Sequence, residues 1–491
     1  MVNLSISTGS FEGLKHAAVR PLLKPDDVDP EKLSSYRPIS NLTFLSKLVE
    51  RVVLSRLQNH MDAINFKCDN QFGYKKNHST ETLLINKLLN DILVGLDASS
   101  GVVLILIDLS AAFDTVNINK LINILHSQLN ISGVALKWFK SYLKNRTQRV
   151  LVGNCFSDPM ELSFGVPQGS VLGPILFNIY ITCLSTVFLT SGFQTMSYAD
   201  DNSGYQVFSL SSEQSMFTEH IPDLLQNISC WMEEYFLKLN QDKTKIIVFG
   251  SKNFQSNLVN STVTPHSGKI IKIVDAVKYL GVRLDNRLTM KPHINKVTSN
   301  CYRVLRKIKS IRSFITQDQC ETLINASVTS RLDYCNSLLF NLSWNNCVGK
   351  LAKVQRYSSK IILRKGRRQG LPYNIRLDIL HWLPVEKRIA FKVLMIVFKC
   401  LHNKAPKLLS STLLVRTTGR FSHTNMLYTN LFYATSSFGN RAFIYYAPRL
   451  WNSLPNDLRQ VDTLFSFKKK LKTYLFESFD ILMQRFNMYR S

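Results

Sequence analysis

The stretch FQTMSYADDNSGYQVFS, residues 193–209, has short apolar runs on both sides of two adjacent aspartates. This pattern predicts a tight β-hairpin with Asp200 and Asp201 at its turn. Adjacent carboxylates repel each other, so keeping them together costs free energy unless positive charge compensates. An ordinary exposed turn is the simpler interpretation of the hairpin taken alone, because Asp-Asp-Asn is common turn chemistry.

A third carboxylate follows a strongly apolar run. GVVLILIDLS (101–110) predicts a buried strand with Asp108 at its C-terminal edge. If this strand lies beside the hairpin, the oxygens of Asp108, Asp200 and Asp201 converge. Such a cluster suits Mg²⁺, which prefers oxygen ligands, and two such ions can serve phosphoryl transfer. Metal would then be the compensating charge.

The remaining patterns predict a mixed α+β chain. Helices are expected over 46–61, over 117–129 with Asn117 as cap, after the Gly/Pro loop at 165–172 with Ser170 as cap, and over 213–239. KTKIIVFG (243–250) predicts another strand. After residue 285 basic helical patterns replace strands. The last part is expected to be helical at first and then irregular and aromatic through FGNRAFIYYAPRLWNSLP (438–455).

The charge of the chain indicates its partners. The 491 residues are 45% hydrophobic, enough for real cores, and 61 Lys and Arg against 34 Asp and Glu give a formal charge of +27. Such an excess favours a polyanionic partner, with nucleic acid first and an anionic membrane surface second. Residues 286–405 hold 23 basic and five acidic side chains. We therefore expect a domain boundary near 285 and a weaker one near 370.

Several classes of protein are disfavoured. We find no run of about 18 apolar residues and no secretory leader, so we expect no membrane span and an intracellular protein. The nine cysteines are scattered singly, without C-x-x-C pairs or Cys/His clusters at zinc spacing, and predict reduced thiols.

Seven motifs in order resemble the reverse transcriptases of LINE-type non-LTR retrotransposons. Residues 24–53 resemble the fingers motif, QFGYKKNHSTETLL (71–84) the next block, and LIDLSAAFDTV (106–116) motif A. Motif B is similar to GVPQGSVLGPILFNIYI (165–181), and motif C to YADD (198–201). Motif D is similar to LKLNQDKTKIIVFG (237–250), and motif E to VKYLGVRLD (277–285). Segments 330–342, 380–403 and 447–459 resemble the tail of such elements.

The resemblance implies a right-hand polymerase of the α+β class. Fingers and palm, with an antiparallel palm sheet, would occupy residues 15–285. A basic helical thumb would follow at 286–370, tracking the phosphates of an RNA–DNA duplex. Residues 371–491 would form a C-terminal extension of unknown role. The implied reaction is RNA-directed DNA synthesis from a primer 3′-end, with an RNA template, a DNA primer and deoxynucleoside triphosphates.

The resemblance also assigns residue roles. Asp108, Asp200 and Asp201 would hold two Mg²⁺ ions, with Mn²⁺ as an alternative, and Lys243 would protonate the leaving pyrophosphate; Lys245 is close enough in sequence to confuse that assignment. Arg37 and, less clearly, Lys24 would bind the triphosphate. Tyr279–Val282 would grip the primer. Asp114 is expected to support structure, with capping of the following helix as the role considered.

Three further positions concern the nucleotide. Phe113 would lie beneath the sugar and exclude a 2′-hydroxyl, so the chain is expected to make DNA, although a core phenylalanine is the simpler alternative. Gln168 and Gly169 would contact the sugar or base pair, with an ordinary turn as the alternative. Gly204 departs from the family pattern and should weaken its strand.

Other interpretations remain open. The chain starts almost directly at the fingers and lacks an endonuclease domain, so we expect a truncated copy whose target nick is supplied in trans. A catalytically silent nucleic-acid-binding remnant is the main alternative, and a maturase of the group II intron type shares the same core. Nuclear action follows from the family resemblance only.

Overall fold

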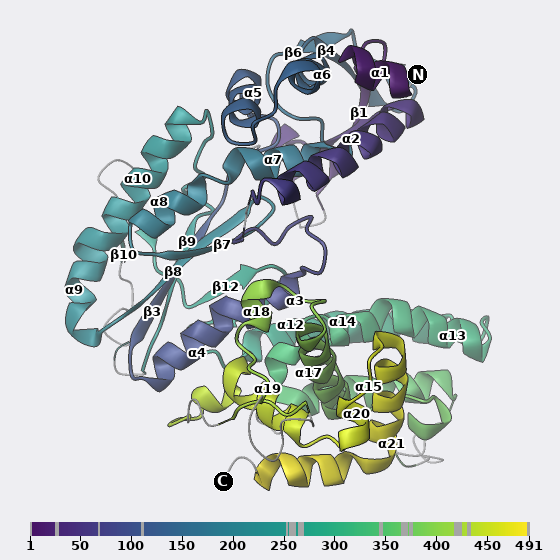
Figure 1. Ribbon diagram of the computed structural model, residues 1–491. Coiled ribbons are helices and arrows are strands. Elements are labelled where there is room, and N and C mark those ends of the chain that lie inside the picture. The colour runs from purple at the N-terminus through teal and green to yellow at the C-terminus, as the bar shows by residue number, and fades with distance from the viewer. Residues whose placement is uncertain are drawn as a thin grey trace.

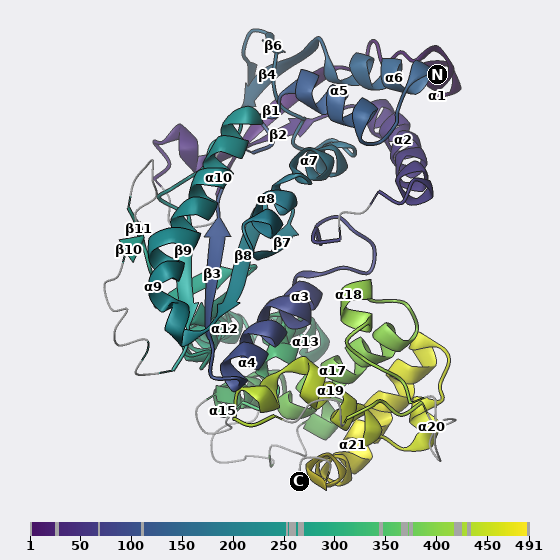
Figure 2. The same cartoon turned by 60° about the vertical axis from the view of Figure 1, so that its left-hand side comes forward.

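The computed structural model describes residues 2–24, 29–66, 69–109, 112–251, 254, 262–263, 270–342, 347–364, 372, 377–416, 425–429 and 434–488 (Figure 1). The boundary expected near 370 lies outside these residues. So does most of the basic stretch ILRKGRRQG, residues 362–370. The described chain forms two lobes joined by a central sheet, and the two lobes face each other across an open side (Figures 1 and 2).

The central sheet has four antiparallel strands in the order β7 (Gln194–Tyr198), β8 (Asp201–Phe208), β3 (Gly101–Ile107) and β9 (Lys245–Phe249). Strand β3 pairs with β8 on one edge and with β9 on the other, and all seven of its residues are buried. The predicted buried strand, the hairpin and the strand at 243–250 are therefore confirmed, as is the expected antiparallel sheet.

Strand β3 divides two hydrophobic cores. Val103, Ile105 and Ile107 belong to the first core, and Val102, Leu104 and Leu106 belong to the other. Side chains alternate between the two faces of a strand, so a strand covered on both faces needs apolar residues throughout. This explains why 101–107 is an unbroken apolar run.

The first core joins the sheet to the N-terminal lobe. Its helices include α2 (Phe44–Ala63), α5 (Ile118–Ser127), α6 (Gly133–Leu143), α7 (Gly173–Ile181), α8 (Leu184–Thr190) and α10 (Ile221–Glu234). The Asn117 side chain caps α5 by accepting from the Lys120 N–H, as predicted. The pattern expected over 213–239 begins with α9 (Glu213–Ser215) and ends with α10 at Glu234.

A second, mostly exposed sheet lies at the far edge of this lobe. Its strands are β2 (Tyr36–Asn41), β1 (His16–Leu23), β4 (Arg146–Val152) and β5 (Cys155–Phe156), with β6 (Met160–Leu162) paired to β4. The short helix α1 (Val2–Thr8) packs near α6 (Figure 1). Strands β1 and β2 run antiparallel, with Leu22 opposite Arg37.

The other core holds the helical lobe. It comprises α3 (Thr80–Leu83), α4 (Asn90–Asp97), the hairpin β12 (Ala276–Tyr279) and β13 (Val282–Asp285), and helices α12 (Lys291–Ser310), α13 (Gln317–Ile324), α14 (Ser330–Asp333), α15 (Gly349–Ile362), α17 (Val385–Leu401), α18 (Lys407–Ser410), α19 (Phe443–Asn452), α20 (Asn456–Arg459) and α21 (Leu464–Met488). The expected change to helices after residue 285 is confirmed. Residues on both sides of 370 share this one core.

The expectation of irregular structure through 438–455 is wrong, because residues 443–452 form helix α19. Pro448 lies inside this helix and removes one backbone hydrogen bond, which normally disfavours a helix. Tyr446 and Trp451 are nevertheless buried in the core. Burial of aromatic side chains of this size stabilises by a few kcal/mol each, enough to offset the proline.

One described segment, Gly173–Thr190, is apolar enough to cross a membrane by length and composition alone, which the sequence analysis did not anticipate. In the structure this segment consists of α7 and α8, and half of it is buried within the protein. Phe177, Tyr180 and Phe188 are fully enclosed in the first core. The segment therefore serves as core helices in this fold.

Candidate active site

The acidic pair lies at the turn between β7 and β8. Tyr198 pairs with Asp201, so Ala199 and Asp200 form the turn itself. Ala199 has φ of +57°, a left-handed conformation that costs a residue with a Cβ about 1 kcal/mol or more. Asn202 Nδ2 donates to the Asp200 carbonyl oxygen over 3.0 Å and helps to close the turn.

Asp108 lies beside this turn, as the sequence predicts. It directly follows β3, whose last residue, Ile107, pairs with Asn202 of β8. Burial raises the pKa of Asp108. The positive charge of Lys243 opposes this increase, and the negative charge of Asp200 adds to it. Desolvation, followed by repulsion from Asp200 and Asp108, raises the pKa of Asp201 to about 6. The three carboxylates therefore act on one another electrostatically.

These residues fit a divalent cation by their chemistry. Asp108 Oδ2 is buried without a hydrogen-bond partner among the described residues, and a hard cation prefers such an oxygen. Mutual repulsion of the three carboxylates is relieved by positive charge between them. In the described part of the chain, however, no three Asp, Glu, His or Cys side chains are yet gathered closely enough to hold a metal ion.

Lysine side chains surround the carboxylates. Lys243 Nζ is 3.7 Å from Asp108 Oδ2, and the Asn240 N–H donates to the Asp108 carbonyl oxygen over 2.9 Å, so the segment before β9 is attached to Asp108. The Lys245 ammonium instead donates to the carbonyl oxygen of Asp242. The geometry therefore brings Lys243, rather than Lys245, to the site. Because Lys243 is 65% exposed, this ion pair adds little stability.

Two further lysines come from elements far apart in the sequence. The charge of Lys24, at the end of β1, opposes the increase in the pKa of Asp108, and the charge of Lys278, on β12, does the same for Asp201. The hairpin of β12 and β13 thus approaches the acidic turn. The hydroxyl groups of Tyr279 and Ser203 lie 3.0 Å apart and join this hairpin to β8.

The loop at 165–172 is bound to the segment after Asp108. The Val166 N–H donates to the Phe113 carbonyl oxygen over 2.9 Å. Gln168 Nε2 donates to both carboxylate oxygens of Asp114, over 3.2 and 3.1 Å. Asp114 therefore supports the loop and does not cap the following helix, which Asn117 caps.

The same loop contacts the strand that carries Arg37. The Ser40 N–H donates to the Gln168 carbonyl oxygen over 2.7 Å. Gly169 has φ of +116°, and a Cβ at this position would lie 2.5 Å from the Ser40 carbonyl oxygen. Glycine is therefore required here for both conformation and space. Strand β2 therefore joins Arg37, whose side chain is exposed, to the loop that contains Gln168 and Gly169.

Phe113 is half-buried at the edge of the first core. Its ring stacks on Phe177 of α7, with centroids 4.5 Å apart and an angle of 20° between the planes. The core packing considered from the sequence is thus present. The ring is nevertheless partly exposed to solvent.

Two buried polar residues that were not among the predicted site residues hold these loops. Glu50 of α2 accepts from the backbone N–H groups of Val171 and Leu172 over 2.6 and 3.1 Å, at the start of α7. Gln71 bonds to Ala199 in the acidic turn. In the sequence, the role of Glu50 is indicated only by its position as a charged residue within the apolar face of a predicted helix. The residue that caps α7 is Leu172 and not, as was predicted, Ser170, although Ser170 Oγ accepts from the N–H of Gly173, the first residue of the helix, over 2.9 Å.

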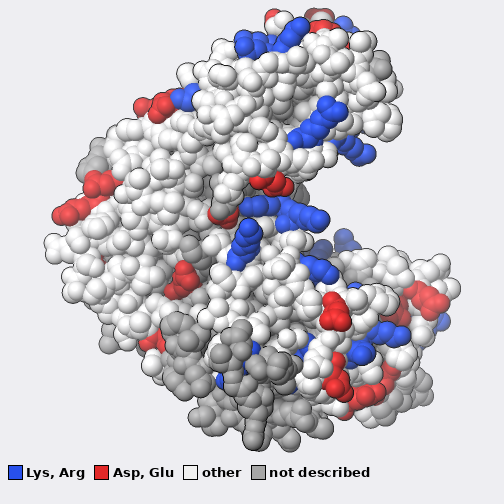
Figure 3. Space-filling model, in the orientation of Figure 1, with Lys and Arg blue, Asp and Glu red and all other residues white. Residues whose placement is uncertain are grey.

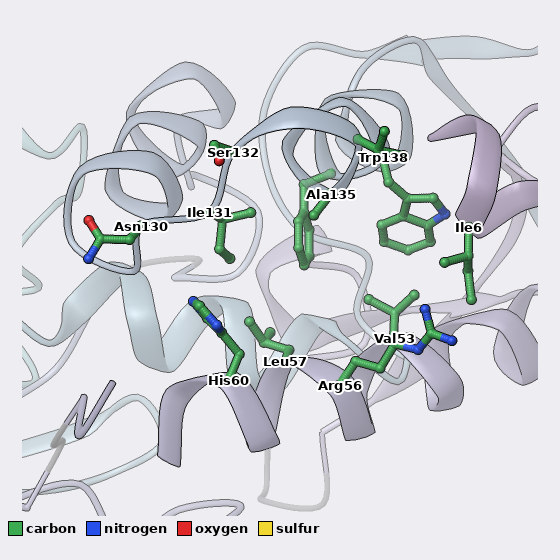
Figure 4. Close-up of a pocket in the computed structure, with 12 residues that line it drawn as sticks. Ile6, Val53, Arg56, Leu57, His60, Asn130, Ile131, Ser132, Ala135 and Trp138 are labelled. Atoms are coloured by element: carbon green, nitrogen blue, oxygen red, sulfur yellow. The ribbon is translucent and has the colours of Figure 1, made fainter. Parts of the chain in front are cut away.

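The surface of the protein is hollowed into a notch between the two lobes (Figure 3). Figure 3 shows the notch with Lys and Arg side chains along its walls. The loop that contains Gln71 runs from α2 to α3 on the side where the two lobes face each other (Figure 2), and its Gln71 side chain bonds to Ala199 in the acidic turn. A separate cavity of about 510 Å³ between α2 and α6 is lined by Val53, Leu57 and Trp138 and by none of the predicted site residues (Figure 4).

Residues 22–284 match the family model described as reverse transcriptase (RNA-dependent DNA polymerase). The chain is 32% identical over 303 residues to a probable RNA-directed DNA polymerase from transposon BS of Drosophila melanogaster, covering 60% of this chain and 32% of the relative. It is 29% identical over 304 residues to the RNA-directed DNA polymerase from mobile element jockey of the same species, with coverage of 60% and 32%.

A solved telomerase structure from Candida tropicalis, in complex with a TWJ fragment of telomeric RNA, is similar over 94% of this chain and 64% of that one, at 12% identity and a TM-score of 0.43. The aligned part of the chain spans about a third of the length of its curated transposon relatives. The family match covers more than half of the chain and includes every predicted site residue. The chain belongs to the reverse transcriptase family, and its curated relatives are non-LTR retrotransposon polymerases.

Proposed function

We propose that this chain copies RNA into DNA by adding deoxynucleotides to the 3′-end of a primer. The observation that carries the proposal is that Asp108, at the end of β3, lies beside the Asp200–Asp201 turn of the paired β7–β8 hairpin in a protein of the reverse transcriptase family. The sheet of β7, β8, β3 and β9 would be the palm of a right-hand polymerase within residues 15–285. Residues 286–370 would be the thumb, followed by the extension at 371–491.

Asp108, Asp200 and Asp201 would hold two divalent cations, Mg²⁺ or Mn²⁺, which when bound activate the primer hydroxyl and stabilise the leaving pyrophosphate. The Lys243 ammonium, beside Asp108, would donate a proton to the pyrophosphate oxygen as it leaves. The Arg37 guanidinium is suited to bidentate contacts with the triphosphate, and Lys24 would add charge there.

The remaining residues would orient the substrates. The loop with Gln168 and Gly169 lies between Phe113 and the strand of Arg37, where a nucleotide sugar would fit. The β12–β13 hairpin, with Tyr279–Val282 at its turn, would hold the primer end near the carboxylates. The basic walls of the notch would bind the phosphates of the RNA–DNA duplex without reading sequence. On the family resemblance alone, the site of action would be the nucleus.

The test is primer extension on poly(rA)/oligo(dT) with dTTP and Mg²⁺. We expect extension by the wild-type protein and only background extension by the Asp200→Asn, Asp201→Asn double variant. Both should bind the duplex, because the exchange removes metal ligands and leaves the basic walls intact. Glu161→Gln, an exposed carboxylate on β6, is the matched control and should remain active.

A wild-type protein that folds and binds the duplex but extends no primer would overturn the proposal. The chain would then be a nucleic-acid-binding remnant. Equal extension by the wild-type protein and the double variant would contradict the role of the carboxylates.

A further inference from the structure

The side chain of Gln71 forms three hydrogen bonds around the acidic turn. Its Oε1 accepts from the Ala199 N–H and from the Gly73 N–H, both over 2.8 Å. Its Nε2 donates to the Ala199 carbonyl oxygen over 3.1 Å. Gln71 is 7% exposed, so these bonds are shielded from water. One amide therefore satisfies both backbone polar groups of the residue that precedes Asp200.

Ala199 needs such support. Its φ of +57° is unfavourable for a residue with a Cβ, and such conformations persist where surrounding contacts fix them. The peptide unit of Ala199 also sets the direction of the Asp200 side chain. Two adjacent carboxylates tend to move apart, so an unsupported turn would place them variably.

The loop that carries Gln71 is packed directly on the turn. The Phe72 N–H donates to the Ser197 carbonyl oxygen, and the Ser197 N–H donates to the Asn70 carbonyl oxygen, each over 2.8 Å. A Cβ at Gly73 would lie 2.4 Å from the Ala199 nitrogen, so only glycine allows this approach. The loop thus extends the edge of β7 and covers the turn.

The loop is in turn held by α7. Asn178 Nδ2 donates to the Gly73 carbonyl oxygen over 3.0 Å, and Asn178 is 5% exposed. Helix α7 begins at the loop that contains Gln168 and Gly169. A continuous set of contacts therefore joins the proposed nucleotide-binding loop, α7, the Gln71 loop and the acidic turn.

We propose that Gln71 is a positioning residue that fixes the Ala199–Asp200 turn and thereby the direction of the Asp200 carboxylate toward Asp108. The proposal rests on the proposed function for its effect on catalysis. Gln71 touches neither substrate nor reacting atoms. It acts through the backbone of Ala199 alone, so its loss changes the placement of a carboxylate rather than removing one.

The test compares three variants of the full chain. Gln71→Met keeps the length of the side chain and removes all three hydrogen bonds. Gln71→Glu keeps an acceptor for the two N–H groups and loses the donor to the Ala199 carbonyl oxygen. Gln206→Met is the matched control, because Gln206 lies at the other end of β8 and its Oε1 has no hydrogen-bond partner among the described residues.

The first measurement is hydrogen–deuterium exchange of the peptide covering residues 196–204, which requires no activity. We expect faster exchange in Gln71→Met, an intermediate rate in Gln71→Glu and the wild-type rate in Gln206→Met. Unchanged exchange in Gln71→Met would overturn the proposal. If that variant fails to fold, Gln71→Glu decides in its place by whether its exchange rises.

The second measurement is primer extension with titrated Mg²⁺ and dTTP. Because misplacement of a reacting group by about 1 Å can cost roughly 10²-fold, we expect kcat of Gln71→Met to fall by about 10- to 100-fold. The Mg²⁺ concentration for half-maximal rate should rise, while KM for dTTP and duplex affinity change less than about twofold. If Gln71→Met has the kcat and the Mg²⁺ dependence of the wild type, the proposed effect of Gln71 on catalysis is wrong.

Failure of the proposed function and failure of the positioning role of Gln71 give different results. An inactive wild-type protein rejects the proposed function, and exchange at the turn then decides the structural role of Gln71 by itself. An active wild-type protein with an equally active, equally protected Gln71→Met variant rejects the positioning role alone.

Discussion

At the scale of single residues, the structure gives Phe113 two roles that experiment can separate. Its ring stacks on Phe177, as a core residue would, and its carbonyl oxygen accepts from Val166 of the proposed nucleotide-binding loop. If the ring also excludes a 2′-hydroxyl, Phe113→Val should admit ribonucleotides. We expect the preference for dTTP over UTP, as the ratio of kcat/KM values, to fall by about tenfold or more, since a steric exclusion of a few kcal/mol is lost.

Phe164→Val is the control for this prediction, because Phe164 is 52% exposed beside the same loop. It should retain the preference for dTTP. If Phe113→Val instead loses turnover on both nucleotides equally and keeps their ratio, the ring serves only the core.

At the scale of elements, the hairpin is better supported than its sequence indicates. Gly204 was expected to weaken β8, yet seven residue pairs join β8 to β3. A Cβ at Gly204 would lie 2.4 Å from ring carbons of Phe188, which is fully buried on α8. The glycine therefore lets an aromatic ring pack on the strand, and its departure from the family pattern has a structural reason.

The junction of β13 and α12 makes stability depend on pH. The Arg283 N–H donates to His293 Nδ1 over 3.4 Å, and burial, with repulsion from Arg283, lowers the pKa of His293 to about 4. The unfolded chain binds a proton near pH 6.5, whereas the folded chain binds it only near pH 4. The free energy of unfolding therefore falls as pH decreases between these values.

We expect His293 to lower the free energy of unfolding by about 2 kcal/mol between pH 7 and pH 5. Once the histidine of the unfolded chain is protonated, the free energy of unfolding falls by about 1.4 kcal/mol per pH unit. Urea denaturation at the two pH values measures it, with His293→Gln for comparison. The variant should lose less stability than the wild type, and His16→Gln, an exposed histidine, should behave as the wild type. Equal losses in wild type and His293→Gln would contradict the prediction.

At the scale of the whole molecule, the C-terminal segment is part of the helical lobe. Asp97, at the end of α4, accepts from the N–H groups of Thr435 and Ser436, and Asn90 accepts from the N–H of Ile444. Lys392 of α17 forms an ion pair with Glu81 of α3 over 3.2 Å. The boundary expected near 370 stays a prediction, but residues from α17 onward cover the apolar faces of α12–α15 in one shared core.

We therefore expect a chain shortened after residue 364 to aggregate. Removal of α17, α19 and α21 would expose core residues such as Leu332 and Leu339 to water. Size-exclusion chromatography and thermal unfolding measure the effect against the full chain. A shortened protein that stays monomeric and unfolds at the same temperature would show that the segment folds as an independent domain.

The sequence by itself determined the buried strand before Asp108, the acidic hairpin, the antiparallel character of the central sheet and several helices. These features follow from short-range causes: the alternation of side chains along a strand, helical periodicity, and residues such as Asn117 that cap their own helix. The ordered motifs added the family, which the comparison over residues 22–284 confirmed.

Only the tertiary structure decided how these pieces hold one another. The bonds of Gln71 to Ala199, of Glu50 to Val171 and of Asp97 to Ser436 each join residues more than 100 positions apart. No local pattern encodes such partners, because a buried polar side chain looks the same in sequence whether it meets one backbone or another. The helix at α19 formed for a related reason: burial of Tyr446 and Trp451 against distant helices outweighed the local effect of Pro448.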